Sequence, residues 1–342
     1  MRNTRSSPAR SRFATRLVAG LGAVALATTL AACASSDASE SGTAADGSIT
    51  VGAVSNGAAT ETSITVSTVE SIRAKVPQAI RDKGTLVVGL GLLPSGSVPL
   101  GFTGSDQKTL TGSEPDIGRL IAAVLGLEPV LDNATWENLF VGIDSGKTDV
   151  GLSNITDTEK RKEKYDFASY RQDNLGFEVL KSSDWNFDGD YENLAGQTVA
   201  VGAGTNQEKI LLEWQTKLKA EGKTLDIKYF PEANSTYLAL SSGEISAYFA
   251  PNPSIAYHVT QTASSPSATR AAGTFSGAGT TLQGLIAATT KKGNGLAEPL
   301  ADAINYLIDN GQYAQWLKAW NLTNEAVPKS EVNPPGLPLD NA

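Results

Sequence analysis

From residue 84 onward, short apolar runs alternate with amphipathic helical patterns. The run TLVVGLGLL at 85–93 is rich in β-branched and aliphatic residues and predicts a strand. Residues 113–126 follow, with apolar positions on one helical face, and predict a helix. A second strand pattern at 197–204 and a helical pattern from 205 repeat this order. Such alternation is typical of α/β layers around a mainly parallel sheet.

Local signals mark the ends of the two predicted helices. Ser113 with Asp116, and Thr205 with Glu208, have the spacing of a capping box. Gly126 can end the first helix in a left-handed conformation. We therefore expect each helix to begin directly after the loop that follows its strand.

The two halves of the chain share a further phrase. DSGKTDVGLSN from Asp144 and SSGEISAYFAP from Ser241 each carry Ser-Gly, three residues and a short apolar strand. Two similar α/β lobes are expected, with a cleft at the carboxyl ends of their strands. Residues 174–183 would lead the chain out of the first lobe, and 283–293 would bring it back. The helical pattern after 296 would then complete the first lobe.

The N-terminus has the pattern of a signal peptide. Five arginines precede a nearly charge-free stretch at 17–32, which is short and weak for a spanning helix. Leu30-Ala31-Ala32-Cys33 resembles the bacterial lipobox, whose cysteine is lipid-modified and becomes the first mature residue. Cys33 is the only cysteine, so we expect it to be the lipidation site. The alternative is a plain secretory signal with an incidental cysteine.

Composition narrows the remaining classes. Residues 34–47 carry no large apolar side chain and predict a flexible tether. Cleavage after residue 32 removes five arginines and no acid, which shifts the formal charge from −8 to −13. This charge argues against nucleic acid as a partner. With one cysteine and one histidine, His258, neither a disulfide framework nor a zinc cluster is expected.

Several longer segments, in order and with family spacing, resemble the polar-amino-acid (family 3) solute-binding lipoproteins of bacterial ABC importers, in their actinobacterial branch. The segments are GTLVVG from Gly84, GSEPDIGRLIAAVLG from Gly112, ATWENLFVGIDSGKTDVGLSNITDTEKR from Ala134, YDFASY from Tyr165, LAGQTVAVGAGTNQE from Leu194 and DNGQYAQWLKAWNL from Asp309. The resemblance implies a type II periplasmic-binding-protein-like fold, with two α/β lobes joined by a two-strand hinge. It implies a monomer without cofactor that captures a small carboxylate-bearing solute.

The same resemblance implies the partners, the location and the boundaries. The partners are an ABC permease and its ATPase, and the protein is lipid-anchored to the outer face of the cell membrane. The expected segments are a signal peptide at 1–32, a tether at 33–48, an N-terminal extension at 49–83, lobe 1 at 84–178 and 284–325, lobe 2 at 179–283, and a tail at 326–342.

The resemblance also assigns the ligand-binding residues. It implies that Arg161 binds the solute carboxylate, with Thr156 contributing a hydroxyl and Asn154 a backbone carbonyl. A guanidinium can bind a carboxylate through two parallel hydrogen bonds. From lobe 2, the backbone N–H groups of Thr205 and Asn206 would face the same carboxylate from a helix N-terminus. Without the resemblance, Arg161 fits a surface charge and Thr205 a simple helix cap.

Three further positions concern the rest of the solute. Trp136 lies where the family often stacks an aromatic on the ligand, although a packing role fits it as well. Pro251 replaces the aspartate that commonly binds the α-ammonium, which leaves Asn252 as a possible substitute. Gly91 replaces an acid at the end of the first strand, before a long loop that ends at Phe102, which is also expected to bind the solute. A carboxylated, less cationic or more apolar solute is therefore expected.

Two other classes remain open. The same fold hosts secreted dehydratases that act on prephenate-like acids, for which Glu114 is the one candidate acid. Glu114 lies in the first turn of a predicted helix, where a structural role suffices. A ligand-sensing surface lipoprotein is the second alternative.

Overall fold

The computed structural model describes residues 47–339. The predicted signal peptide at 1–32, the predicted lipidation site Cys33 and nearly all of the predicted tether lie outside the described residues. Ser48, at the end of that tether, begins the first strand. None of the helices within 47–339 combines the length and apolarity needed to cross a membrane.

The first lobe is built on a short parallel sheet. Strand β3 (Thr85–Leu93) pairs in parallel with β6 (Glu128–Thr135) and β7 (Val150–Gly151), and β13 (Gly284–Lys291) runs antiparallel to β7. Its helices are α3 (Ser113–Val124), α4 (Trp136–Ser145), α8 (Ala297–Asp309) and α9 (Gln312–Ala319), with the 3-10 turns η1 (Arg161–Glu163) and η3 (Thr323–Glu325). Helices α3 and α4 both pack on β3 and β6.

The second lobe repeats this plan. Strand β9 (Thr198–Ala200) lies between β10 (Asp226–Lys228) and β11 (Ala247–Pro251) and is parallel to both. The remaining elements are β12 (Thr269–Ser276), the helices α5 (Asn206–Ala220), α6 (Ala233–Ser242) and α7 (Asn252–Thr262), and the 3-10 turn η2 (Tyr191–Leu194).

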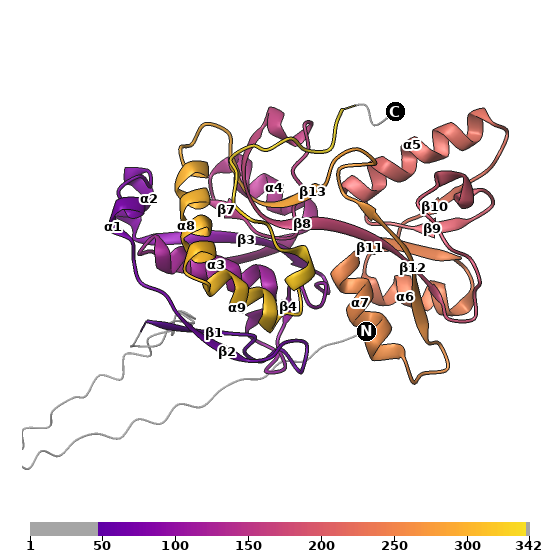
Figure 1. The fold of residues 1–342 in the computed structure, drawn as a ribbon, viewed down its shortest axis with the longest axis horizontal. Helices are drawn as coiled ribbons and strands as arrows, with labels where there is room; N and C mark the ends of the chain where they lie inside the picture. The colour runs from indigo at the N-terminus through magenta and orange to yellow at the C-terminus, as the bar shows by residue number, and fades with distance from the viewer. Residues whose placement is uncertain (1–46, 340–342) are drawn as a thin grey trace, which may run out of the picture. The chain divides into compact units, whose positions relative to one another are not determined.

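One strand belongs to both lobes. Strand β8 (Tyr165–Leu180) is 16 residues long; residues 165–173 pair with β13 in lobe 1, and residues 174–180 pair with β12 in lobe 2. Strand β11 pairs with the lobe 2 part as well, so all these strands form one nine-stranded sheet (Figure 1). Eight strands follow the order β10-β9-β11-β8-β13-β7-β3-β6, and β12 pairs with β8 off this path. The chain returns to lobe 1 between β12 and β13. The predicted two-lobed α/β fold is confirmed.

An N-terminal extension packs on lobe 1. It consists of a hairpin of β1 (Ser48–Val51) and β2 (Thr62–Thr65), followed by α1 (Glu70–Arg73) and α2 (Gln78–Lys83). A second small hairpin pairs β4 (Phe102–Thr103) with β5 (Leu110–Thr111). The apolar side chains of β1 and β2 join the lobe 1 core, so the extension is an integral part of this lobe.

The predicted capping box at the start of α3 is wrong. The N-cap residue is Gly112, and no side chain caps the helix. Asp116 is buried, and its Oδ2 accepts hydrogen bonds from the N–H of Gly52 at 2.8 Å and from Nε1 of Trp320 at 3.0 Å. A buried carboxylate needs such partners, and here they fix the N-terminal hairpin to the lobe. At α5 the predicted N-cap Thr205 is confirmed, because its Oγ1 accepts from the N–H of Glu208 at 3.2 Å, while the Glu208 carboxylate accepts from the N–H of Gly204 and not from that of Thr205.

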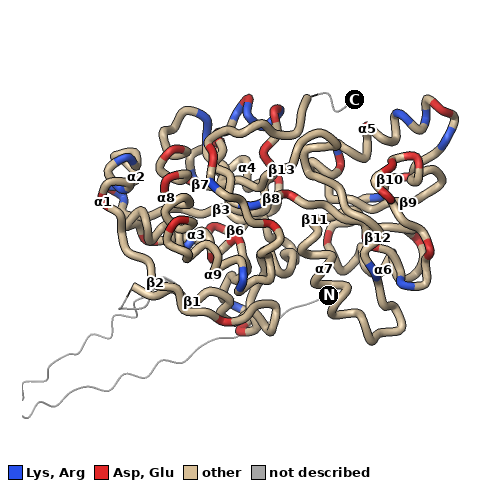
Figure 2. Tube along the Cα trace, viewed as in Figure 1, with Lys and Arg blue, Asp and Glu red and all other residues tan. Residues whose placement is uncertain are grey.

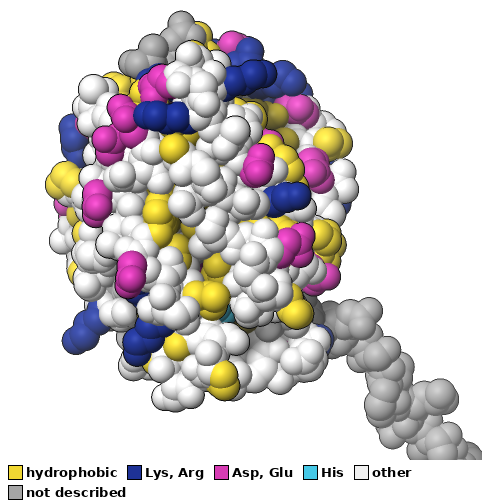
Figure 3. Space-filling view, turned by 90° about the vertical axis from the view of Figure 1, so that its right-hand side faces the viewer, with side chains coloured by type: hydrophobic (Ala, Val, Ile, Leu, Met, Phe, Trp, Pro, Cys, Tyr) yellow, Lys and Arg dark blue, Asp and Glu magenta, His cyan; other side chains and the backbone are white. Residues whose placement is uncertain are grey.

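The two lobes have separate cores, both mainly aliphatic. The lobe 2 core also contains a cluster of aromatic rings, in which Phe177 stacks on Phe249 with centroids 4.3 Å apart. On the surface, acidic and basic positions are interspersed along the elements of both lobes (Figure 2). The end of the molecule formed by lobe 2 likewise shows both signs among many uncharged side chains (Figure 3).

Candidate functional site

A cavity of about 230 Å³ lies between the two lobes. Lobe 1 contributes the end of β3 with the loop after it, at 91–97, and the loop after β7, at 153–154. Lobe 2 contributes the turn between β9 and α5, at 202–207, and the end of β11, at 248–251. These segments follow the carboxyl ends of parallel strands, where open α/β sheets bind ligands.

Four of the predicted ligand-binding residues line this cavity, namely Trp136, Asn154, Thr205 and Asn206. Gly91 and Pro251, the positions where acids of the family are replaced, line it as well. The other four predicted residues, Arg161, Thr156, Phe102 and Asn252, are not part of its lining.

Arg161 lies beside the cavity and connects the two lobes. Its Nη1 donates to the carbonyl oxygen of Thr156 at 2.9 Å, and its Nη2 donates to that of Gly204 at 3.3 Å. The guanidinium carbon is 5.5 Å from the ring centroid of Trp136 and 5.4 Å from that of Phe140, within cation–π range. Burial lowers the pKa of Arg161 to about 10, so the side chain remains charged at neutral pH.

Arg161 and Trp136 of lobe 1 both bind the backbone of Gly204 in lobe 2. Its carbonyl oxygen also accepts a hydrogen bond from Nε1 of Trp136, at 3.3 Å. A second contact between the lobes joins the hydroxyls of Ser97 and Ser254, 2.7 Å apart. The structure therefore shows the cleft in a closed arrangement.

Thr156 and Asn206 meet at a buried carboxylate that the sequence did not single out. Asp173 Oδ2 accepts from Thr156 Oγ1 at 2.7 Å and from Asn206 Nδ2 at 3.0 Å. Burial raises the pKa of Asp173. Because these side chains are engaged with Asp173, they are not free to bind a ligand in this arrangement.

Phe102 and Asn252 lie away from the cavity. Phe102 is buried in lobe 1, where its ring packs edge-on against Trp320 with centroids 6.3 Å apart. Asn252, the first residue of α7, lines a different groove, shared with residues 318–325 of lobe 1.

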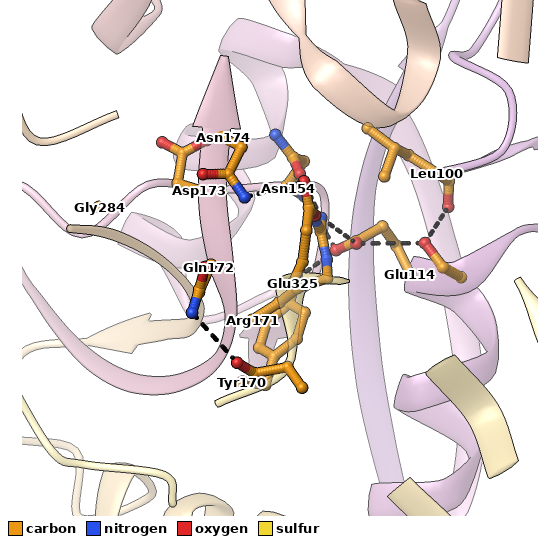
Figure 4. A network of polar contacts seen from close by, with 12 residues as sticks. Leu100, Glu114, Asn154, Tyr170, Arg171, Gln172, Asp173, Asn174, Gly284 and Glu325 are labelled. Carbon is orange, nitrogen blue, oxygen red and sulfur yellow. Dashed lines mark hydrogen bonds and ion pairs between the residues drawn. The ribbon is translucent and has the colours of Figure 1, made fainter. Parts of the chain in front are cut away.

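The floor of the cavity is a network of buried charges (Figure 4). Glu114 accepts hydrogen bonds from the N–H of Asn154 at 2.9 Å and from Nη2 of Arg171 at 3.2 Å, and it also binds the hydroxyl of Tyr170. Arg171 further binds Glu325 and the side-chain oxygen of Asn154. Burial alone would lower the pKa of Arg171, but the carboxylates of Glu325 and Glu114 outweigh it and raise the pKa.

These bonds determine the charge that the cavity presents. Glu114 is the only charged residue among its lining residues, and it is fully buried and paired. Gln207 at the start of α5 is 6% exposed, and its Oε1 has no hydrogen-bond partner. The first N–H groups of α5 have no intrahelical acceptors and carry the positive end of the helix dipole. Between residues 47 and 339 no cluster of acidic, cysteine or histidine side chains could hold a metal.

Three residues of the site, Arg171, Asp173 and Gln207, were not predicted from the sequence. A usable signal existed for the first two, since YRQDN places opposite charges in the middle of a long apolar strand. Charges at such positions are rarely buried unless they are paired. Gln207 gave no comparable signal, because a polar residue in the first turn of a helix is ordinary.

The chain is similar to known proteins in sequence and in structure. The model of the family "Bacterial extracellular solute-binding proteins, family 3" matches residues 92–323. The L-cystine-binding protein TcyJ of Escherichia coli (strain K12) is 32% identical over 170 residues, which cover 49% of this chain and 59% of that protein. The chain thus aligns with less than two thirds of that relative.

Two further matches cover more of the chain. The arginine-binding protein ArgT of Corynebacterium glutamicum is 27% identical over 268 residues, covering 78% of this chain and 83% of ArgT. Among solved structures, an ancestral arginine-binding protein bound to arginine superposes with a TM-score of 0.60 at 26% identity, covering 69% of this chain and 98% of that one.

The loop that carries Arg161 gives a prediction on pH. Asp157 is fully buried, both its oxygens lack hydrogen-bond partners, and its nearest cation is Lys162 Nζ at 3.4 Å. Burial raises the pKa of Asp157 to about 7, against the opposing effect of Lys162, while Glu159 raises it and Arg161 lowers it slightly. The folded state therefore retains a proton that the unfolded chain releases above about pH 4.

The contribution of Asp157 to the free energy of unfolding is therefore largest at low pH, and it is lost as the pH rises from about 4 to about 7. The loss is at most about 1.4 kcal/mol per pH unit. We expect Asp157→Asn to flatten this part of the pH profile in denaturant titrations at pH 5, 6 and 7. The exposed Asp184→Asn is the control and should keep the parent slope. An unchanged slope in Asp157→Asn would show that Asp157 is ionised throughout.

Proposed function

We propose, since the chain belongs to the bacterial extracellular solute-binding proteins, family 3, that it captures a small carboxylate-bearing solute between its lobes and delivers it to an ABC permease. The observation that carries this proposal is the closed cavity itself. The start of α5 lies on its wall, and none of the described residues that line it offers a free acid.

The carboxylate end of the solute is assigned to the start of α5. The backbone N–H groups of Thr205 and Asn206 lie on the cavity wall, and such a helix start favours an anion. Arg161 adds a charge next to this position. In the closed arrangement its Nη2 is bonded to Gly204, so a solute carboxylate would replace or supplement that carbonyl as its partner.

Two other lining positions argue for a solute with little positive charge. Pro251 and Gly91 line the wall where relatives of this type hold an ammonium, and neither can pair with a cation. Glu114 is already paired with Arg171 and does not offer a free carboxylate. Desolvating an ammonium without a partner is costly, so a carboxylated and weakly cationic or apolar solute fits best. An amino acid fits only if its amine is bound by backbone carbonyls.

Capture is assigned to a hinge closure of the two lobes. Ligand contacts to both lobes favour the closed state, as in other two-lobed binding proteins. The crossing points are residues 173–174 in β8 and the return before β13. A monomer suffices for this mechanism, because both walls of the cavity come from one chain.

Partners and location complete the proposal. The solute is passed to a permease and ATPase of the ABC type, and the protein acts outside the cell while anchored through a lipid on Cys33. A sensing role for the same cleft is the alternative. The dehydratase alternative loses its candidate acid, because the oxygens of Glu114 already accept bonds from Asn154, Tyr170 and Arg171.

A solute screen tests the proposal directly. We expect a member of a panel of amino acids, amines and small carboxylic acids to raise the melting temperature of the mature domain. Arg161→Ala should weaken the binding of that solute by about 2–5 kcal/mol, because the variant leaves the bound carboxylate unpaired. Isothermal calorimetry measures this as a dissociation constant at least about 30-fold larger.

The neighbouring Lys160→Ala is the matched control for this variant. Lys160 is exposed and pairs only with the exposed Glu163, so its removal should leave affinity at the parent value. Equal affinities of Arg161→Ala and the parent would move the carboxylate elsewhere in the cleft.

Pro251→Asp tests the charge of the cavity wall at this position. Aspartate is a good N-cap residue, and Pro251 occupies the N-cap position of α7, so the variant should fold. We expect it to bind standard α-amino acids more tightly than the parent does, while Pro251→Asn, which is neutral and of equal size, does not. Calorimetry with L-glutamine and L-alanine measures the difference. If both variants behave alike, the position does not face the amine.

Cys33→Ser tests the anchor. We expect this variant to lose lipid label in cells fed a radiolabelled fatty acid and to remain as precursor or appear in the medium. Cys33→Ala should behave identically, because only the thiol can be alkylated. Label retained by either variant would rule out Cys33 as the attachment site.

A further inference from the structure

The C-terminal segment 326–339, here named the strap, runs along the lobe 1 half of β8 after η3 (Figure 1, yellow). The N–H of Ser169 donates to the carbonyl oxygen of Glu331 at 3.1 Å. The N–H of Asn333 donates to the carbonyl oxygen of Phe167 at 2.9 Å, and Asn333 Oδ1 accepts from the N–H of Phe167 at 2.9 Å. The strap is thus fixed at the edge of the cleft. The family match ends at residue 323, before it begins.

Further along, the strap pairs with the loop that carries Arg161. The N–H of Leu337 donates to the carbonyl oxygen of Asp157 at 3.2 Å, and the N–H of Glu159 donates to that of Leu337 at 3.0 Å. The N–H of Gly336 donates to Glu159 Oε1 at 2.9 Å. These bonds span the backbone between Thr156, whose carbonyl holds the guanidinium, and Arg161 itself.

Gly336 is required at this contact for steric reasons. A Cβ atom there would lie 2.5 Å from the carbonyl oxygen of Asp157, so a side chain would force the loop and the strap apart. The two segments therefore approach as closely as their backbones allow.

The end of the strap reaches lobe 2. The side chain of Leu337 is 1% exposed and packs in a hydrophobic cluster whose other members, at 175–278, all belong to lobe 2. Lys209 Nζ on α5 donates to the carbonyl oxygen of Pro338 at 3.1 Å. One residue, Leu337, thus holds the Arg161 loop with its backbone and lobe 2 with its side chain.

We infer that Leu337 is a positioning residue for solute capture, which sets the Arg161 loop against lobe 2 and favours the closed cleft. Opening the lobes must either withdraw Leu337 from the lobe 2 core or pull the Arg161 loop along with it. The role in capture rests on the proposed function, whereas the mechanical link is a property of the ligand-free protein and is tested without a solute.

The strap itself provides a matched pair of variants. Leu337→Ala removes the buried side chain, and Leu339→Ala makes the same change two residues further on, where the side chain is 56% exposed. In hydrogen–deuterium exchange of the ligand-free mature protein, Leu337→Ala should speed exchange at the amides of 157–161 by about ten-fold or more. Small-angle X-ray scattering should show a larger radius of gyration. Leu339→Ala should match the parent in both measurements.

The opposite result is equally clear. If Leu337→Ala lowers the melting temperature but keeps parent-like exchange at 157–161 and a parent-like radius, Leu337 only stabilises the core and the inference is wrong. Should Leu337→Ala fail to fold, Leu337→Val removes a single methylene and is expected to shift both readings in the same direction by less. If no solute in the panel raises the melting temperature, but Leu337→Ala shows the expected faster exchange and larger radius, the result would count against the proposed function alone.

Discussion

The structure depends on a positive charge buried in the strand that joins the lobes. Arg171 is 1% exposed in the middle of β8, and an unpaired charge at such a position costs several kcal/mol. Its partners are Glu325 after α9, Glu114 at the start of α3 and Asn154 in the cleft. One guanidinium therefore connects the hinge strand, the cavity floor and the C-terminal part of lobe 1. The cavity can be uncharged at its wall because this network neutralises the acid beneath it.

Much of the fold could be predicted because its signals are local. The strand at 85–93, the glycine after α3 and the cap of α5 are set by residues within one turn or one strand. The cap of α3 could not be predicted in the same way. Asp116 has the correct spacing, but its carboxylate binds Gly52 and Trp320, which lie 64 and 204 residues away, and the nearby Arg119, instead of capping the helix.

The candidate site shows the same division. Chain order and family spacing bring Trp136, Asn154 and the start of α5 to one cavity, since each follows a strand end. The direction of a side chain depends on contacts with residues far away in the sequence, which no local pattern encodes. The hydroxyl of Thr156 therefore turns to Asp173, and Arg161 turns to the carbonyl of Gly204, where a free guanidinium was expected.

The distribution of tryptophans has an optical consequence. Of the five, four belong to the lobe cores and contact neighbours within their own lobe. Trp136 alone spans the cleft, with its indole N–H bonded to Gly204 and its ring against Arg161. Separation of the lobes would break that bond and admit water to this indole, while Trp185, Trp214 and Trp316 would keep their surroundings within one lobe. The intrinsic fluorescence of the unlabelled protein thus reports the state of the cleft chiefly through Trp136.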